Sequence, residues 1–282
     1  MSYLDELNEI QRQAVTHITG PALIIAGPGS GKTRVLTFRI AHLIESGIPP
    51  WEILTLTFTN KAAKEMKERI TKVAGANANN IWAGTFHSVF ARILRSEASK
   101  IGYPSDFSIY DSQDAKSAIT EIVKKRGLDS KVYNASAVYS RISLAKNNVI
   151  SPEAYALDTE RIKEDKQRKM PYIYKIYDLY VKKCMRSGAM DFDDLLYQMY
   201  RLLDENPENV LEKYQKRFKY ILVDEFQDTN QLQYSIIQKL ITYPGSTKNV
   251  CVVGDDAQSI YAFRGATIQN ILDFEKEFPD IT

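Results

Sequence analysis

ALIIAGPGSGKT, residues 22–33, is the stretch of this 282-residue sequence that constrains the fold most. An apolar run with the length of a buried strand leads into a glycine-rich turn, and the turn leads into Lys32, Thr33 and a helical pattern. A strand, a glycine-rich loop and a helix in this order are typical of a loop that binds phosphate groups. The stretch therefore predicts an α/β fold with this loop at the carboxyl end of a strand.

Four further apolar runs end in small or polar residues and lead into helical patterns: ILTLTFT (53–59), IWAGTFH (81–87), YILVDEF (220–226) and NVCVVGD (249–255). Nearly continuous apolar strands that alternate with helices indicate a parallel sheet covered by helices on both faces. We predict an α/β fold of this kind, a P-loop NTPase sheet. Its functional groups should collect at the carboxyl ends of the strands.

The segment between IWAGTFH and YILVDEF has no comparable strand pattern over about 130 residues, far more than a connection inside a compact sheet requires. The sequence predicts a core formed by 1–95 and 215–282 and a mostly helical insertion over 96–214, with boundaries good to about ten residues. Within the insertion, PYIYKIYDLYVKK predicts a helix that begins at Pro171. Its apolar face indicates a core seam rather than a base-stacking platform, and consists of Ile173, Ile176, Tyr177 and Tyr180.

The net charge of +2 conceals two regions of opposite sign. Residues 111–190 contain 16 Lys and Arg against 10 Asp and Glu, a net charge of +6, whereas the other residues contain 21 against 25, a net charge of −4. Clusters such as RIKEDKQRK (161–169) suit a phosphate backbone, and they suit a solvated helix face equally well. Charge alone leaves both interpretations open.

The composition, 44% hydrophobic and 26% charged, is that of an ordinary globular chain. No run approaches the ~18 apolar residues of a membrane-spanning helix, and the N-terminus lacks the basic start and apolar centre of a secretory signal. We expect a cytoplasmic protein without a membrane partner. Cys184, Cys251 and the three histidines fit no redox or metal spacing, so we expect both cysteines at packing positions.

The glycine-rich loop has the chemistry of a nucleotide site. Gly27, Gly29 and Gly31 let successive N–H groups turn inward around phosphate oxygens. Lys32 would reach the β- and γ-phosphates of a nucleoside triphosphate, and the Thr33 hydroxyl would bind Mg²⁺. The predicted loop residues are Ala26, which replaces the usual glycine, and Gly27, Pro28, Gly29, Ser30, Gly31, Lys32 and Thr33.

In YILVDEFQDTN (220–230), two adjacent acids, Asp224 and Glu225, follow a predicted buried strand. Asp224 can hold Mg²⁺ in its outer shell, while Glu225 can orient and deprotonate the attacking water. A helix N-terminus explains one such carboxylate, but it explains an Asp-Glu pair on a buried strand poorly. The pair therefore favours hydrolysis of the triphosphate over its transfer to a metabolite.

The run NVCVVGD continues into DAQSIYAFRGA, which places an amide, two aromatic rings and a cation after a strand. Gln258 can sense the γ-phosphate from the neighbouring strand. Tyr261, Phe263 and Arg264 suit stacking on single-stranded bases, although Phe263 taken alone is more typical of a core position.

Six ordered motifs together resemble the UvrD/PcrA/Rep family of superfamily 1 DNA helicases: LNEIQRQAV, AGPGSGKT, TFTNKAAKEM, GTFHS, DEFQDTN and GDDAQSIYAFRGA. The resemblance covers about residues 4–280 and implies a RecA-like motor domain. It implies ATP and Mg²⁺ as cofactors, 3′-to-5′ movement on single-stranded DNA, and unwinding at duplex junctions in DNA repair or replication. No protein partner is indicated.

The resemblance also implies roles for individual residues. Gln11 would read the adenine edge, and Arg34 would lie beside the base. The residues implied to meet the DNA strand are Phe58, Asn60, Lys61, Thr85 and His87, together with Tyr261, Phe263 and Arg264. For His87 a polar cap on the following helix is an equal alternative.

One residue departs from the family pattern, and one segment that matches the pattern has a structural explanation. Phe263 stands where the family commonly has Trp, which keeps stacking but reduces the ring area. MDFDDLL (190–196) matches a family motif, but Asp191 as a helix cap with acids in the first turn explains it, so we assign it no catalytic role.

A family member carries a second motor domain, which we expect to follow shortly after residue 282 and to supply further ATP-binding residues. We expect the 282 residues alone to hydrolyse ATP very poorly. Three alternatives differ in class: a motor subunit of a helicase–nuclease complex, a catalytically silent ATP- and DNA-binding module, and a P-loop kinase for a metabolite. Glu225 and the motif order argue against the kinase.

Overall fold

The computed structural model describes residues 3–27, 29–255 and 269–282. The chain forms two compact units, one from Met1–Val89 with Glu208–Thr282 and the other from Phe90–Pro207. We call them the core unit and the insertion unit. The sequence predicts an insertion over 96–214, and both ends of the insertion unit lie within ten residues of those limits.

The core unit contains one five-stranded parallel sheet, in the order β1-β7-β6-β2-β3. Its strands are β1 (Ala22–Ile25), β2 (Ile53–Thr57), β3 (Trp82–Thr85), β6 (Tyr220–Val223) and β7 (Val250–Gly254). Each of the five apolar runs supplies one strand, so the prediction of a parallel α/β sheet is confirmed. Every residue of β2 and β7 is buried, as expected for central strands covered on both faces.

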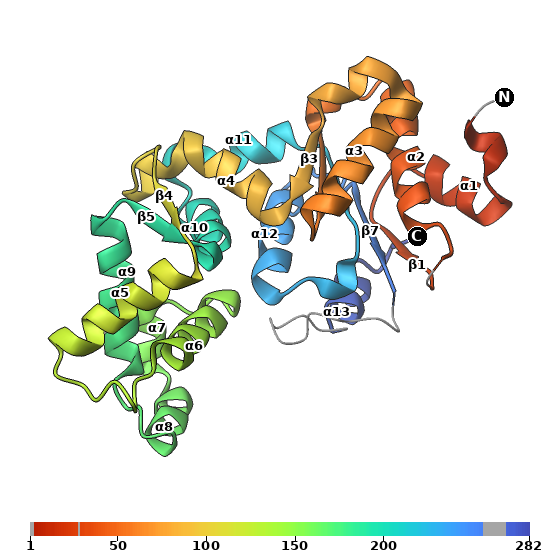
Figure 1. The fold of residues 1–282 in the computed structure, drawn as a ribbon. Coiled ribbons are helices and arrows are strands. Elements are labelled where there is room, and N and C mark those ends of the chain that lie inside the picture. The colour runs from red at the N-terminus through yellow and green to blue at the C-terminus, as the bar shows by residue number, and fades with distance from the viewer. Residues whose placement is uncertain (1–2, 28, 256–268) are drawn as a thin grey trace. The chain divides into compact units, whose positions relative to one another are not determined.

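The helices of the core unit connect these strands. They are α1 (Glu9–Thr16), α2 (Lys32–Glu45), α3 (Asn60–Ala74), α11 (Val210–Arg217), α12 (Gln231–Ile241), α13 (Gln269–Glu277) and the start of α4 (Phe86–Glu97). The chain advances across the sheet in one direction through α2 and α3 and returns through α12. Right-handed crossovers therefore place α2 and α3 on one face and α12 on the other (Figure 1).

Leu36 and Ile40 of α2 and Met66 of α3 share one hydrophobic cluster with the sheet residues Leu222 and Cys251. Cys251 and, in the insertion unit, Cys184 are buried free thiols, which confirms both as packing positions. The described residues also form short 3-10 helices: η1 (Tyr3–Glu6), η2 (Pro50–Glu52), η3 (Gly75–Asn80), η4 (Ala98–Ile101), η5 (Pro207–Asn209) and η6 (Phe226–Asp228). Among the described residues, no helix combines the length and the apolar character needed to cross a bilayer.

The insertion unit is mostly helical, as the sequence predicts. Its helices after α4 are α5 (Ser112–Lys125), α6 (Ala135–Asn147), α7 (Pro152–Leu157), α8 (Thr159–Gln167), α9 (Ile173–Arg186) and α10 (Phe192–Glu205). The predicted apolar face of α9 is buried in the core of this unit, although α9 begins at Ile173 and not at Pro171. Two strands that sequence analysis missed, β4 (Ser108–Tyr110) and β5 (Ala189–Asp191), pair in parallel. Strands of three residues are too short to show the alternation of apolar and polar residues that identifies a strand in a sequence.

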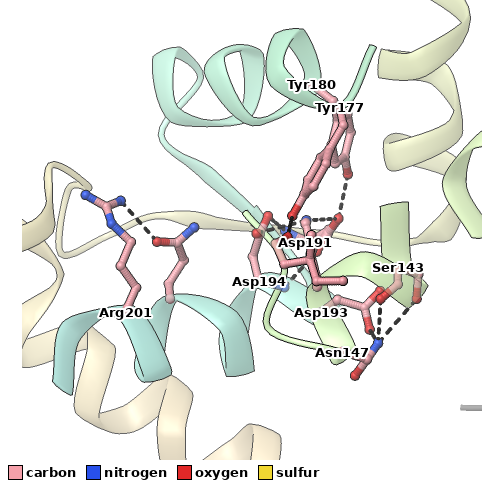
Figure 2. A network of polar contacts seen from close by, with 11 residues as sticks. Ser143, Asn147, Tyr177, Tyr180, Asp191, Asp193, Asp194 and Arg201 are labelled. Carbon is pink, nitrogen blue, oxygen red and sulfur yellow. Dashed lines mark hydrogen bonds and ion pairs between the residues drawn. The ribbon is translucent and has the colours of Figure 1, made fainter. Parts of the chain in front are cut away.

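A buried charge cluster holds α6, α9 and α10 of the insertion unit together. Lys146 is fully buried, and its Nζ lies 2.8 Å from Asp191 Oδ2 and 2.8 Å from Asp194 Oδ1. Asp191 also caps α10, because its Oδ1 accepts a bond from the Asp194 N–H and the Asp194 carboxylate accepts one from the Asp191 N–H. The Tyr180 hydroxyl donates to Asp191 over 2.7 Å (Figure 2). The capping role predicted for Asp191 from MDFDDLL is thus confirmed, whereas no sequence pattern indicates that Lys146 pairs with these acids.

The acids of the cluster have different pKa values. Burial alone would raise the pKa of Asp191, but Lys146 and Tyr180 outweigh it and lower that pKa. Burial and the charge of Asp191 raise the pKa of Asp194 to about 6. The two carboxylates therefore depend on the single Lys146 ammonium for compensation.

Lys146→Met should destabilise the insertion unit by about 3–5 kcal/mol, because it leaves buried carboxylates without their cation. Hydrogen–deuterium exchange of peptides from α9 and α10 would report this loss as faster exchange. The matched control is Lys182→Met, since Lys182 is 59% exposed and its ion pair with Asp178 lies on the helix surface. Equal protection in the two variants would contradict a stabilising role for the cluster.

Candidate functional site

The pairing order of the sheet brings the predicted nucleotide-binding residues together. β1 pairs with β7 and β7 pairs with β6, all in parallel, so their carboxyl ends lie side by side at one edge of the sheet. The glycine-rich loop follows β1, Asp224 follows β6, and Asp255 follows β7. Residues from three distant parts of the sequence thus form one candidate nucleotide site.

The glycine-rich loop adopts backbone conformations that suit glycine. Gly29 has φ of +74° and Gly31 has φ of +86°, both in the left-handed region. Gly31 is the N-cap residue of α2 and provides no side chain that could cap the first N–H groups. The N-terminus of α2 therefore presents the kind of uncapped backbone donors that bind phosphate oxygens.

Gln11 contacts this loop directly. Its Nε2 donates to the Ser30 carbonyl over 3.1 Å, and its Oε1 accepts from the Asn8 N–H in the capping box of α1. The structure thus places Gln11 beside the loop, while recognition of an adenine edge by Gln11 stays a prediction. Arg34 forms an ion pair with Glu6, and its guanidinium lies 5.3 Å from the centre of the Phe38 ring.

Asp224 is a buried acid that faces the start of α2. It is 2% exposed, and its Oδ2 lies 3.5 Å from the Thr33 hydroxyl, a long contact. Burial and the neighbouring Glu225 carboxylate raise the pKa of Asp224 to about 6. The carboxylate is therefore held where an additional positive charge would be favourable.

Glu225 is the residue at which the backbone turns away from the sheet. It has φ of 51° and ψ of 47°, a left-handed conformation that costs a non-glycine residue roughly 1–2 kcal/mol. Its N–H donates to Asp224 Oδ1 over 3.0 Å, which fixes the two adjacent acids relative to each other. A strained backbone at a candidate catalytic residue is a common sign of function.

Two residues of this site, Asp255 and Gln227, are not among those predicted from the sequence. Asp255 forms an ion pair with Lys32, with 3.2 Å between Nζ and Oδ2 and exposed side-chain fractions of 1% and 10%. Gln227 donates from Nε2 to Glu225 Oε2 over 2.7 Å. Both residues stand inside motifs that the sequence singled out, but nothing in the motifs indicates which side chains meet.

Five of the predicted DNA-contacting residues lie at or directly after the ends of β2 and β3: Phe58, Asn60, Lys61, Thr85 and His87. The rings of Phe58 and Phe86 lie 5.4 Å apart at a tilted angle. Asn60 opens α3 after the Thr59 cap, and the Lys61 side chain is 87% exposed. These five residues therefore lie on a part of the carboxyl edge separate from the phosphate loop, Asp224 and Asp255.

Thr85 is buried, and its hydroxyl accepts a bond from the Ser88 N–H over 3.1 Å at the start of α4. The cap that sequence analysis considered for His87 is thus supplied by Thr85. His87 is half-buried in the first turn of α4. DNA contact by either residue stays a prediction.

Several predicted site residues lie outside the described part of the chain. They are Pro28 of the loop, and Gln258, Tyr261, Phe263 and Arg264.

Asp224→Asn should stabilise the ligand-free protein at high pH. The folded state raises the pKa of Asp224 from 3.8 to about 6. Below pH 3.8 the protonated side chain carries no buried charge and does not lower the free energy of unfolding. As the pH rises through about 6 the side chain ionises in the folded protein, and the free energy of unfolding falls. The variant removes a buried charge and should gain up to about 3 kcal/mol at pH 8, with a smaller gain at pH 5.

Denaturant unfolding in buffer with EDTA at these two pH values measures the gain. Asp280→Asn, at an exposed position, is the control. An equal effect of Asp224→Asn at both pH values would contradict the raised pKa.

Comparison with known proteins agrees with the geometry of this site. The family model described as UvrD/REP helicase N-terminal domain matches residues 7–279. The chain is 46% identical over 278 residues to the ATP-dependent DNA helicase PcrA of Bacillus subtilis (strain 168), a match that covers 98% of this chain and 36% of that protein.

Further relatives give the same result. The PcrA helicase of Staphylococcus aureus (strain Mu50 / ATCC 700699) is 46% identical, with 98% of this chain and 37% of that protein covered. The PcrA helicase of Staphylococcus epidermidis (strain ATCC 35984 / DSM 28319 / BCRC 17069 / CCUG 31568 / BM 3577 / RP62A) is 46% identical over 275 residues, with 97% and 36% covered. The chain spans about a third of the length of these curated relatives. With a family match over nearly its whole length, the chain belongs to the UvrD/REP helicase N-terminal domain family.

Proposed function

We propose that the protein carrying this chain hydrolyses ATP and uses the reaction to move 3′ to 5′ along single-stranded DNA and unwind duplex junctions. The observation that carries the proposal is the meeting of the phosphate loop with Asp224 and Glu225 at one edge of the sheet. The names of the relatives, ATP-dependent DNA helicases, support the same function. A role in DNA repair or replication and a cytoplasmic location are part of this proposal.

ATP binds with its phosphates at the N-terminus of α2 in this proposal. The N–H groups of the loop and of the first turn of α2 hold the phosphate oxygens. Lys32 exchanges its ion pair with Asp255 for the β- and γ-phosphates, which carry more negative charge than one carboxylate. Glu225 orients the attacking water and accepts its proton.

The residues present fit Mg²⁺. Thr33 and Asp224 offer a hydroxyl and a carboxylate, the hard oxygen ligands that this ion prefers. The described residues contain no group of three or more His, Cys, Asp or Glu that could enclose a metal. Two protein oxygens suit an ion that completes its shell with phosphate oxygens and water. When bound, Mg²⁺ would neutralise negative charge on the phosphates.

We assign the DNA strand to the ends of β2 and β3. The N-terminal turn of α3 presents Asn60 and Lys61 to solvent, and a helix N-terminus attracts phosphate. Phe58 lies nearby with a half-buried ring. Backbone donors, an exposed cation and an aromatic ring together suit sequence-tolerant binding of a single strand.

Glu225→Gln should lower kcat for ATP hydrolysis in the full-length protein by at least about 100-fold while nucleotide affinity changes little. Lys32→Ala should instead weaken nucleotide binding, because it removes the cation that meets the phosphates. Steady-state ATPase assays with single-stranded DNA, together with titration of a fluorescent ATP analogue, separate the two effects. Lys64→Ala, at an 80% exposed position, is the control for Lys32.

Equal loss of binding and hydrolysis in Glu225→Gln would contradict its role as the base. DNA binding that is unaffected by Lys32→Ala, without any ATPase activity in the wild type, would point to the silent binding module.

Lys61→Ala should weaken binding to single-stranded DNA of any sequence and reduce the slope of log K against log salt concentration by about 1. Lys64→Ala is a matched control. Lys61 and Lys64 lie on the same helix, are 87% and 80% exposed, and each has a Glu four residues later at 4.0 Å. Fluorescence anisotropy at several salt concentrations measures the slope. If both variants changed it equally, the DNA path assigned here would be wrong.

A further inference from the structure

Gln227 occupies a buried position between two functional parts of the nucleotide site. It lies in η6, two residues after Glu225, and is 3% exposed. Its Nε2 donates to Glu225 Oε2 over 2.7 Å, and its Oε1 accepts from the backbone N–H of Asp255 over 3.0 Å. One amide side chain therefore connects the candidate catalytic base to the residue that follows β7.

The two contacts fix the orientation of the amide. A rotation by half a turn would place the Gln227 oxygen against the Glu225 carboxylate and the Gln227 nitrogen against the Asp255 N–H. Both pairs would then be mismatched, acceptor against acceptor and donor against donor. A buried amide with mismatched partners is costly, so the arrangement has one stable orientation.

The end of β7 provides the space for this amide. A Cβ added at Gly254 would lie 3.0 Å from Gln227 Oε1 and 3.5 Å from the Gln227 backbone nitrogen. Glycine at 254 therefore lets the amide reach the Asp255 N–H. Asp255 in turn holds Lys32 through its carboxylate, so a chain of contacts runs from Glu225 through Gln227 and Asp255 to the phosphate loop.

We propose that Gln227 is a positioning residue for ATP hydrolysis. It holds the Glu225 carboxylate in one orientation and ties it to the end of β7, the strand that pairs with the strand before the phosphate loop. The proposal rests on the function proposed above, in which Glu225 orients the attacking water. Loss of this hold misplaces the base relative to the γ-phosphate, and misplacement by about 1 Å lowers a rate on the order of 100-fold.

The test compares Gln227→Met with Gln215→Met in the full-length protein. Methionine keeps the length of the side chain and removes both hydrogen bonds. Gln215 is the matched control, because it is a buried glutamine of the core unit whose Nε2 donates to the Lys239 carbonyl over 2.7 Å. Gln227→Met should lower kcat by about 10- to 100-fold and leave KM within about threefold, whereas Gln215→Met should leave both nearly unchanged.

Gly254→Ala provides a second, independent perturbation of the amide. It should lower kcat several-fold in the wild-type background and clearly less in the Gln227→Met background, because the hydrogen-bonded amide that it displaces is then already absent. This single variant also tests the proposal if Gln227→Met does not fold.

Three results would overturn the proposal: a kcat of Gln227→Met within threefold of the wild type, a loss confined to KM, or equal effects of Gly254→Ala in both backgrounds. Glu225→Gln and Lys32→Ala separate this failure from failure of the proposed function. If both of those variants hydrolyse ATP normally, the proposed function fails. If both are impaired and Gln227→Met is not, only the role of Gln227 fails.

Discussion

The parallel pairing of β1 with β7 and of β7 with β6 is the constraint on which the candidate site depends. These strands come from opposite ends of the chain, and Ala22 lies beside Cys251. Parallel neighbours end at the same edge of the sheet, so three loops that are remote in sequence converge there. The phosphate loop, the two adjacent acids and Asp255 meet for this reason alone.

Electrostatic compensation differs between the two units. In the insertion unit, two buried acids share the ammonium group of Lys146, at 2.8 Å from each. In the core unit, Asp224 is equally buried, but the Thr33 hydroxyl is a long and neutral contact. The first arrangement is complete within the protein, which suits a structural role. Asp224 has this long hydroxyl contact where the insertion acids have an ammonium group at 2.8 Å, and that arrangement suits a site that receives a positively charged ligand.

Glu225 has both a strained backbone and a carboxylate held by a hydrogen bond. Its left-handed backbone directs the chain into η6, and this turn brings Gln227 back toward the Glu225 carboxylate. The Gln227 amide then reaches the end of β7, where Gly254 leaves room for it. Local strain and a long-range contact thus act together on the same carboxylate, which is the arrangement expected where orientation of a group matters more than stability.

The sequence by itself determined the five strands, the parallel α/β class, the helical insertion and the family, because apolar runs, glycine spacing and ordered motifs are local patterns. It also identified the apolar face of α9 and the cap formed by Asp191. Only the tertiary structure decided that Lys146 neutralises the insertion acids and that Gln227 joins Glu225 to Asp255. Those contacts join residues whose proximity depends on how strands and helices pack, and no local pattern encodes that packing. The short strands β4 and β5 were not predicted for a related reason, since three residues form a strand only when a partner from elsewhere in the chain pairs with them.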